Sequence, residues 1–149
     1  MVITDILKIE HSMLNYQAEE IERYLPKVRD LAELRGQLEI YKAALFSHAN
    51  LEEELLFRQL ETYIGTDGVV LSLRDNMGHY EMEKGVDAIL AYDDLEQVKS
   101  LVPRLVVKVR KHFEAEESVL FPLAEEEMKY RHLGELGDQW LAQRGNGKE

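Results

Sequence analysis

Two stretches of this chain repeat one arrangement of side chains that could bind a metal ion. Each reads His-x-x-x-Glu-Glu-x, followed by an aliphatic pair and a phenylalanine. The stretches occupy residues 48–57 and 112–121. Side chains four residues apart lie on the same face of a helix. His48 and Glu52 therefore present an imidazole and a carboxylate to one point, and His112 and Glu116 do the same.

Both pairs lie within the apolar stripe of a predicted helix. The first stripe runs through Leu34, Leu38, Tyr41, Leu45, Leu55 or Leu56, and Leu60, and the second through Val102, Leu105, Val109, Val119 or Leu120, and Leu123. An ionised carboxylate in a protein core is strongly disfavoured unless a positive charge meets it. No lysine or arginine lies in either stripe beside the pair, so we expect a metal ion to neutralise the carboxylates.

The composition limits the kind of protein and the kind of site. With 149 residues, 45% of them hydrophobic, the chain suits one domain with a sizeable core. It has no cysteine, so any metal must be held by nitrogen and oxygen. The net charge of −11 argues against binding to nucleic acid or to an anionic membrane. Neither a membrane span nor a secretory signal is recognisable, and we expect a soluble cytoplasmic protein.

The first half of the chain predicts two helices. Thr4 is expected to cap the first, and Pro26 to end it, with His11 in its apolar stripe. The second is expected to open at Asp30 and to run to about Tyr63. A turn formed by Gly65-Thr66-Asp67-Gly68 should follow.

The second half predicts two more long helices and a short one. The third helix is expected over residues 68–92, with Asn76, His79 or Tyr80, and Glu83 in its polar gap. The fourth should begin between Asp94 and Ser100. A start near Ser100 is favoured, because it places Pro103 in the first turn. A short closing helix is expected around residues 133–141. We expect the domain to span residues 1–143 and the tail 144–149 to be disordered.

The predicted fold class is all-α, an antiparallel up-down-up-down four-helix bundle with a short C-terminal helix. At about 1.5 Å per residue, polar residues of all four helices fall between about 10 and 20 Å from one end. These residues are His11, Glu52, His79 and His112. Four imidazoles and two carboxylates at one level can hold two metal ions that share the carboxylates as bridges. Such ligands suit iron, manganese or zinc, with iron or manganese favoured.

The order of these residues resembles the hemerythrin-like family, also called the HHE cation-binding domain, over about residues 1–130. The matching pattern is His11, His48-x-x-x-Glu52, His79 and His112-x-x-x-Glu116, with Leu-Phe after each carboxylate run. The resemblance implies an antiparallel four-helix bundle around a non-heme di-iron centre, oxo- or hydroxo-bridged. It also implies that His11 and His48 bind one iron, that His79 and His112 bind the other, and that Glu52 and Glu116 bridge them.

The sequence departs from the oxygen-carrying hemerythrins at two positions. Those proteins have a fifth histidine four residues after the third-helix histidine, and an aspartate five residues after the last one. Here Glu83 and Glu117 occupy these positions, and Glu116 matches the glutamate of the non-carrier branch. This pattern resembles bacterial members linked to iron-sulfur cluster repair under nitrosative stress and to iron or oxygen sensing. We therefore expect the centre to react with or sense O2, peroxide or NO, or to handle iron, with Glu83 as a further candidate ligand.

Two other functions are compatible with the same residues. One is reversible binding or storage of O2 on the same fold. The other is a metal-free structural or interaction bundle, in which truncation of His48 or Glu52 would change neither stability nor metal content. Glu53 and Glu117 could orient ligands, and His132 is expected at the surface. The sequence indicates neither a protein partner nor an oligomeric state.

Overall fold

The computed structural model describes residues 1–72 and 78–146. Every regular element in these two ranges is helical, which confirms the all-α class. The α-helices are α1 (Ile3–Tyr24), α2 (Leu31–Glu52), α3 (Arg58–Ser72), α4 (His79–Leu90), α5 (Leu95–Ala115), α6 (Phe121–Glu127) and α7 (Tyr130–Asn146). A 3₁₀ turn, Leu25–Lys27, follows α1. None of the described helices is long and apolar enough to cross a membrane.

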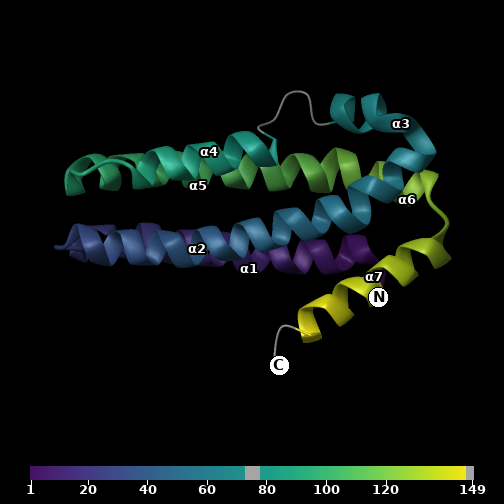
Figure 1. Ribbon diagram of the computed structural model, residues 1–149, viewed down its shortest axis with the longest axis horizontal. Helices are drawn as coiled ribbons and strands as arrows, with labels where there is room; N and C mark the ends of the chain where they lie inside the picture. Colours follow the sequence, from purple (N-terminus) through teal and green to yellow (C-terminus); the bar gives the residue numbers. More distant parts are fainter. Residues whose placement is uncertain (73–77, 147–149) are drawn as a thin grey trace.

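Four helices contact one another in a closed ring. The contacts join α1 to α2, α2 to α4, α4 to α5, and α5 to α1. In Figure 1, α1 and α2 lie side by side and α4 and α5 lie above them. This arrangement is compatible with the predicted four-helix bundle. The C-terminal helix α7 lies outside the ring and packs against α1.

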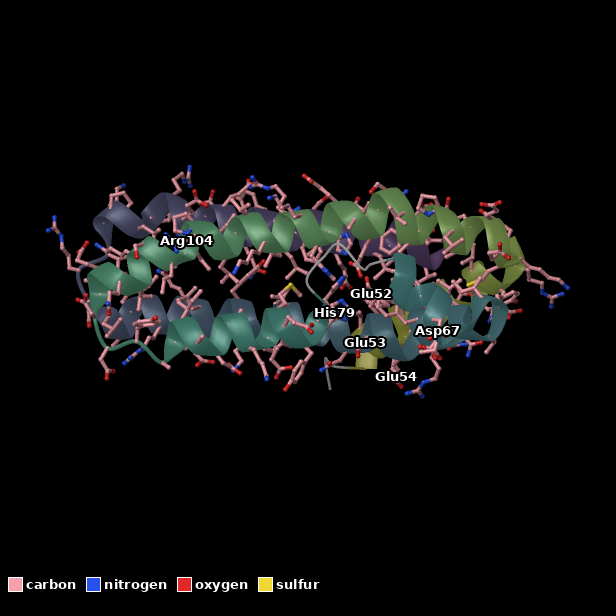
Figure 2. The ribbon with its side chains drawn as sticks, turned by 90° about the horizontal axis from the view of Figure 1, so that it is seen from above. Glu52, Glu53, Glu54, Asp67, His79 and Arg104 are labelled. Atoms are coloured by element: carbon pink, nitrogen blue, oxygen red, sulfur yellow. The ribbon has the colours of Figure 1, made fainter. Side chains whose placement is uncertain are left out.

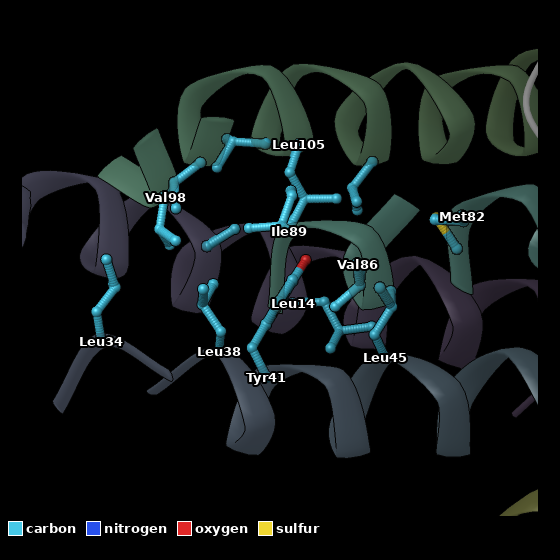
Figure 3. Close-up of a cluster of buried hydrophobic side chains, with 14 of the residues drawn as sticks. Leu14, Leu34, Leu38, Tyr41, Leu45, Met82, Val86, Ile89, Val98 and Leu105 are labelled. Carbon is cyan, nitrogen blue, oxygen red and sulfur yellow. The ribbon is translucent and has the colours of Figure 1, made fainter. Parts of the chain in front are cut away.

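The hydrophobic core has two parts, one on each side of a polar level. One part holds residues of α1, α2, α4 and α5, among them Leu14, Leu45 and Val86 (Figure 3). The other part joins the start of α1 to α3, α6 and α7 and includes Leu7 and Trp140. His11 lies on α1 between Leu7 and Leu14, so the predicted ligand level separates the two apolar clusters.

The beginnings of the first two helices differ in how they are capped. Asp30 accepts a hydrogen bond from the backbone N–H of Ala32 at 3.0 Å, which confirms the predicted start of the second helix. Thr4 does not cap α1, so that prediction is wrong. Its buried hydroxyl donates instead to Glu125 at 2.7 Å and ties α1 to α6. Thr4 thus forms a hydrogen bond to a distant helix in place of the predicted capping bond.

The region after the second helix also differs from the prediction. Gly65 has a φ of 78° and bends the chain, in a conformation that favours glycine. The helix then resumes to Ser72 instead of forming the expected turn over residues 65–68. The third helix of the ring begins at His79, not near residue 68. Asn76 lies outside the described residues.

The fourth helix begins at Leu95, within the predicted range but earlier than the favoured start near Ser100, and Pro103 lies inside it. The added turn buries Val98 completely and continues the apolar stripe to Val102. This burial offsets the hydrogen bond that Pro103 cannot make. The final helix is longer than predicted and extends to Asn146, beyond the expected boundary after residue 143. Residues 147–149 lie outside the described part of the chain.

Two helical glycines lie in opposite environments. A Cβ added to Gly36, in the middle of α2, would have no heavy atom within 4 Å. A Cβ added to Gly137 of α7 would lie 2.0 Å from the carbonyl oxygen of Met1. The absence of a side chain at Gly137 therefore lets α7 approach the backbone at the start of the chain.

We expect Gly36→Ala to raise the free energy of unfolding by about 1 kcal/mol, because alanine is the better helix former. Gly137→Ala should lower it by about 1–3 kcal/mol, because α7 must move away from Met1. Urea unfolding of the two variants measures both effects. Equal changes in the two variants would contradict the close approach of α7 to the N-terminal backbone.

Candidate metal centre

The structure brings six of the seven predicted ligands together. Their ligand atoms form two groups, within each of which all atoms lie within 4.8 Å of one another. One group is His11, His48, Glu52 and Glu116, and the other is Glu52, His79, His112 and Glu116. Both carboxylates belong to both groups. Helices α1, α2, α4 and α5 each supply one imidazole, so the centre depends on the packing of all four.

The two carboxylates lie beside corresponding irregularities in their helices. A π-helical turn, Glu53–Phe57, joins α2 to α3, and another, Glu116–Leu120, joins α5 to α6. In these turns the N–H of Arg58 bonds to the carbonyl of Glu53, and the N–H of Phe121 bonds to that of Glu116. Each turn adds about one residue to the helical repeat and changes the phase of the apolar stripe beyond it. The ligand pair and the following leucines can therefore all face inward.

Each carboxylate directs one oxygen toward each imidazole pair. Oε2 of Glu52 lies 3.4 Å from Nε2 of His48 and 3.8 Å from Nε2 of His11, while its Oε1 lies 3.2 Å from Nε2 of His79. Oε1 of Glu116 lies 3.2 Å from Nε2 of His11. Its Oε2 lies 3.4 Å from Nε2 of His112 and 3.6 Å from that of His79. The two carboxylates thus span the space between the pairs.

The spacing and the burial of these atoms fit metal coordination. Two ligands about 2.0–2.2 Å from one ion, at 90–110° to each other, lie about 3.0–3.5 Å apart. Both oxygens of Glu52 and of Glu116 are buried and have no hydrogen-bond partner among the described residues. The same holds for Nε2 of three histidines, His11, His48 and His112. Each such group costs about 1–3 kcal/mol if it stays unpaired. The cluster could therefore hold a metal ion.

The carboxylates also determine the charge state of the cluster in the absence of metal. Burial disfavours the charged imidazole of His11, but Glu116 and Glu52 outweigh it and raise the pKa of His11 to about 9. Burial likewise opposes the charged form of His79, but Glu116, Glu52 and Glu53 raise its pKa to about 12. Burial would raise the pKa of Glu52, but the close approach of Glu116 and of the imidazoles of His11, His48 and His79 lowers it. Protons therefore occupy the cluster when cations do not.

The remaining residues of each repeat orient an imidazole from the other half of the chain. Oε1 of Glu53 lies 2.7 Å from Nδ1 of His79, and the ring of Phe57 stacks on that imidazole at 5.5 Å. Figure 2 shows His79 beside Glu52 and Glu53. In the second repeat, Oε2 of Glu117 lies 3.4 Å from Nδ1 of His11, and Phe121 stacks on His11 at 5.5 Å. The contact of Glu53 agrees with the orienting role suggested for it, whereas Nδ1 of His11 has no hydrogen-bond partner among the described residues.

A third orienting carboxylate was not predicted from the sequence. Oε1 of Glu10 lies 2.9 Å from Nδ1 of His48. The indole N–H of Trp140 donates to Oε2 of Glu10 at 2.6 Å, and the guanidinium of Arg144 donates to both oxygens at 2.9 Å. Hydrogen bonds from these partners outweigh burial and lower the pKa of Glu10 to about 2. The only local signal is that Glu10 directly precedes His11, since both α7 partners are remote in sequence.

Two other predicted residues lie outside the cluster. Glu83 is exposed on α4 and belongs to neither ligand group. His132 is partly buried, and its Nδ1 lies 3.0 Å from the hydroxyl of Tyr63. The candidate ligands are thus four histidines and two glutamates.

Comparisons with protein-family models, with curated proteins and with solved structures find no match to this chain. The functional assignment therefore depends on the residues and their geometry.

Metal binding should release protons, because a metal ion requires the neutral imidazoles of His11 and His79. Their raised pKa values mean that both carry protons at neutral pH in the metal-free protein. Affinity should therefore rise as pH increases toward about 9 and fall in acid. Calorimetry in two buffers of different ionisation enthalpy measures the released protons. An affinity independent of pH between about 6 and 8 would contradict this linkage.

Proposed function

We propose that this chain is a hemerythrin-like non-heme di-iron protein whose centre reacts with or senses O2, peroxide or NO. The observation that carries the proposal is the split orientation of the two buried carboxylates. Each of Glu52 and Glu116 directs one oxygen to the His11–His48 pair and the other to the His79–His112 pair. A single ion would be bound by only one oxygen of each carboxylate. Two ions would be bound by both oxygens of both carboxylates.

The number of protein ligands would leave room on each iron ion for a small reactant. Each ion would receive two imidazole nitrogens and two carboxylate oxygens from the protein. Four such ligands complete the tetrahedral shell of zinc but leave open positions on iron or manganese. Two divalent ions carry four positive charges against two carboxylates, so the centre would attract an additional anionic ligand. Bound iron would supply one-electron chemistry with small oxidants.

The protein residues provide a confined environment with one more accessible side. Phe113 stacks on His11 at 3.9 Å, and apolar clusters lie on both sides of the ligand level. The side chain of His79 is 9% exposed, while those of the other five ligands are at most 2% exposed. The start of α4 is therefore the side on which a small molecule would reach the centre. The surrounding aromatic and aliphatic side chains exclude bulk water elsewhere.

We expect two iron ions per chain after anaerobic loading with ferrous iron and removal of excess metal. Glu52→Gln or Glu116→Gln should reduce occupancy of both positions, because each carboxylate serves both groups. His48→Ala should reduce mainly one position. Glu83→Gln, which changes an exposed carboxylate on α4, should still bind two ions and is the matched control. An equal loss of bound iron in the Glu83→Gln and Glu52→Gln variants would contradict the assignment of Glu52 as a metal ligand.

Exposure of the reduced, iron-loaded protein to air should produce near-ultraviolet absorption typical of an oxo-bridged ferric pair. We expect removal of oxygen alone not to reverse the spectrum, because Glu83 faces solvent and supplies no fifth imidazole. A reductant should be needed. If O2 is instead taken up and released unchanged through repeated cycles, the protein is an oxygen-storage protein.

A further inference from the structure

The two imidazole pairs are supported unequally by the residues around them. Oε1 of Glu53 lies 2.7 Å from Nδ1 of His79, within hydrogen-bond distance, whereas Nδ1 of His11 lies 3.4 Å from Glu117 and has no hydrogen-bond partner among the described residues. Each pair thus has one imidazole with a hydrogen-bonded Nδ1, and the difference lies in how the bonded carboxylate is held. The side chain of Glu53 is 51% exposed. His48 faces the carboxylate of Glu10, whose side chain is only 18% exposed.

Glu10 is held in place by the C-terminal helix α7. Its two oxygens accept one hydrogen bond from Trp140 and two from Arg144. Arg144 also donates to the hydroxyl of Ser47 at 2.7 Å, and its guanidinium lies 5.1 Å from the Trp140 ring centre. The Trp140 ring meets the His48 ring edge-on, with centroids 5.7 Å apart. One side of the centre is therefore fixed by α7.

Among the described residues, no carboxylate bonds to Nδ1 of His112 as Glu10 does to Nδ1 of His48. Glu10 precedes His11 directly, whereas the residue that precedes His79 is Gly78. The ring of His112 is buried, and its Nδ1 has no hydrogen-bond partner within residues 1–72 and 78–146. The carboxylate that bonds to the His79–His112 pair, Glu53, is half exposed, whereas Glu10 is largely buried and fixed by α7.

We propose that the two metal positions differ in affinity, with the position between His11 and His48 the tighter, and that Glu10 is the positioning residue responsible. A carboxylate on Nδ1 fixes the tautomer and the orientation of an imidazole ligand and raises its basicity. Loss of such a partner typically weakens metal binding by about 10- to 100-fold. The docking of α7 thereby determines the affinity of one position. This inference rests on the proposed two-metal function.

The experiment is an anaerobic titration of the metal-free full chain with ferrous iron in competition with a chelator, which gives two stepwise dissociation constants. Trp140 is the one tryptophan in the chain, and its ring lies beside His48. Quenching of its fluorescence follows iron binding at the centre and should be stronger for an ion at the nearer His11–His48 position. We expect the first equivalent of iron to cause most of the quenching in the unmodified protein.

Glu10→Gln should weaken the first constant by about 10- to 100-fold and leave the second nearly unchanged. Glu125→Gln is the matched control, because it alters a hydrogen bond between α1 and α6 that contacts no imidazole. Trp140→Phe keeps an aromatic ring but removes one hydrogen-bond donor to Glu10, so it should weaken the first dissociation constant by a smaller factor. Because this variant has no tryptophan, its constants are obtained from chelator competition alone. If Glu10→Gln does not fold, Arg144→Met replaces it as the test, because it removes two of the hydrogen bonds that hold Glu10. It should also weaken the first dissociation constant.

The reverse change should strengthen the second position. Among the described residues, a Cβ at Gly78 would meet the flexible end of the Glu81 side chain, at 2.8 Å, which can move to accommodate Gly78→Glu. It should tighten the second constant and reduce the difference between the two. Equal effects of Glu10→Gln and Glu125→Gln, or two identical constants in the unmodified protein, would overturn the inference and leave the two-metal function intact. Absence of any iron binding would instead refute the proposed function.

Discussion

The packing of the helices depends on two completely buried carboxylates that no lysine or arginine contacts within residues 1–72 and 78–146. Glu52 and Glu116 are 0% exposed, and the groups that face them are imidazoles. Such a cluster is favourable only if cations or protons neutralise it. The apolar clusters on both sides prevent water from taking that role. The four helices can pack around Glu52 and Glu116 only if positive charge neutralises these carboxylates. The same charge, as a metal ion, would supply the chemistry of the centre.

The six ligands could be predicted because their signals are local. His48 with Glu52, and His112 with Glu116, are four residues apart within apolar stripes, so helical periodicity alone turns them inward. His11 interrupts a stripe in the same way. The exposure of Glu83 could not be read from the sequence, because α4 begins later than the pattern suggested and its phase was uncertain.

Other features depend on tertiary structure and had no local signal. Glu10 acquires its role only when α7 packs on α1, and Trp140 and Arg144 lie at the far end of the chain. The π-helical turns were visible only as an ambiguity over which of two neighbouring aliphatic residues continued each stripe. Both Leu55 and Leu56 are buried in the first turn, whereas Leu120 is buried and Val119 exposed in the second. The favoured start of α5 within the predicted range was too late, because the burial of apolar side chains outweighed the effect of Pro103.

The exchange of contacts between the two repeats has a consequence for the symmetry of the ligand set. Phe57 stacks on His79 while Phe121 stacks on His11, and the neighbouring glutamates cross over in the same reciprocal way. Reciprocal contacts of this kind are the signature of a two-fold symmetric pair of identical subunits. A helical hairpin with one such repeat could thus form the whole ligand set by self-association. In a single chain that carries both repeats, the residues beside the two halves can differ, as Glu10 and Gly78 do.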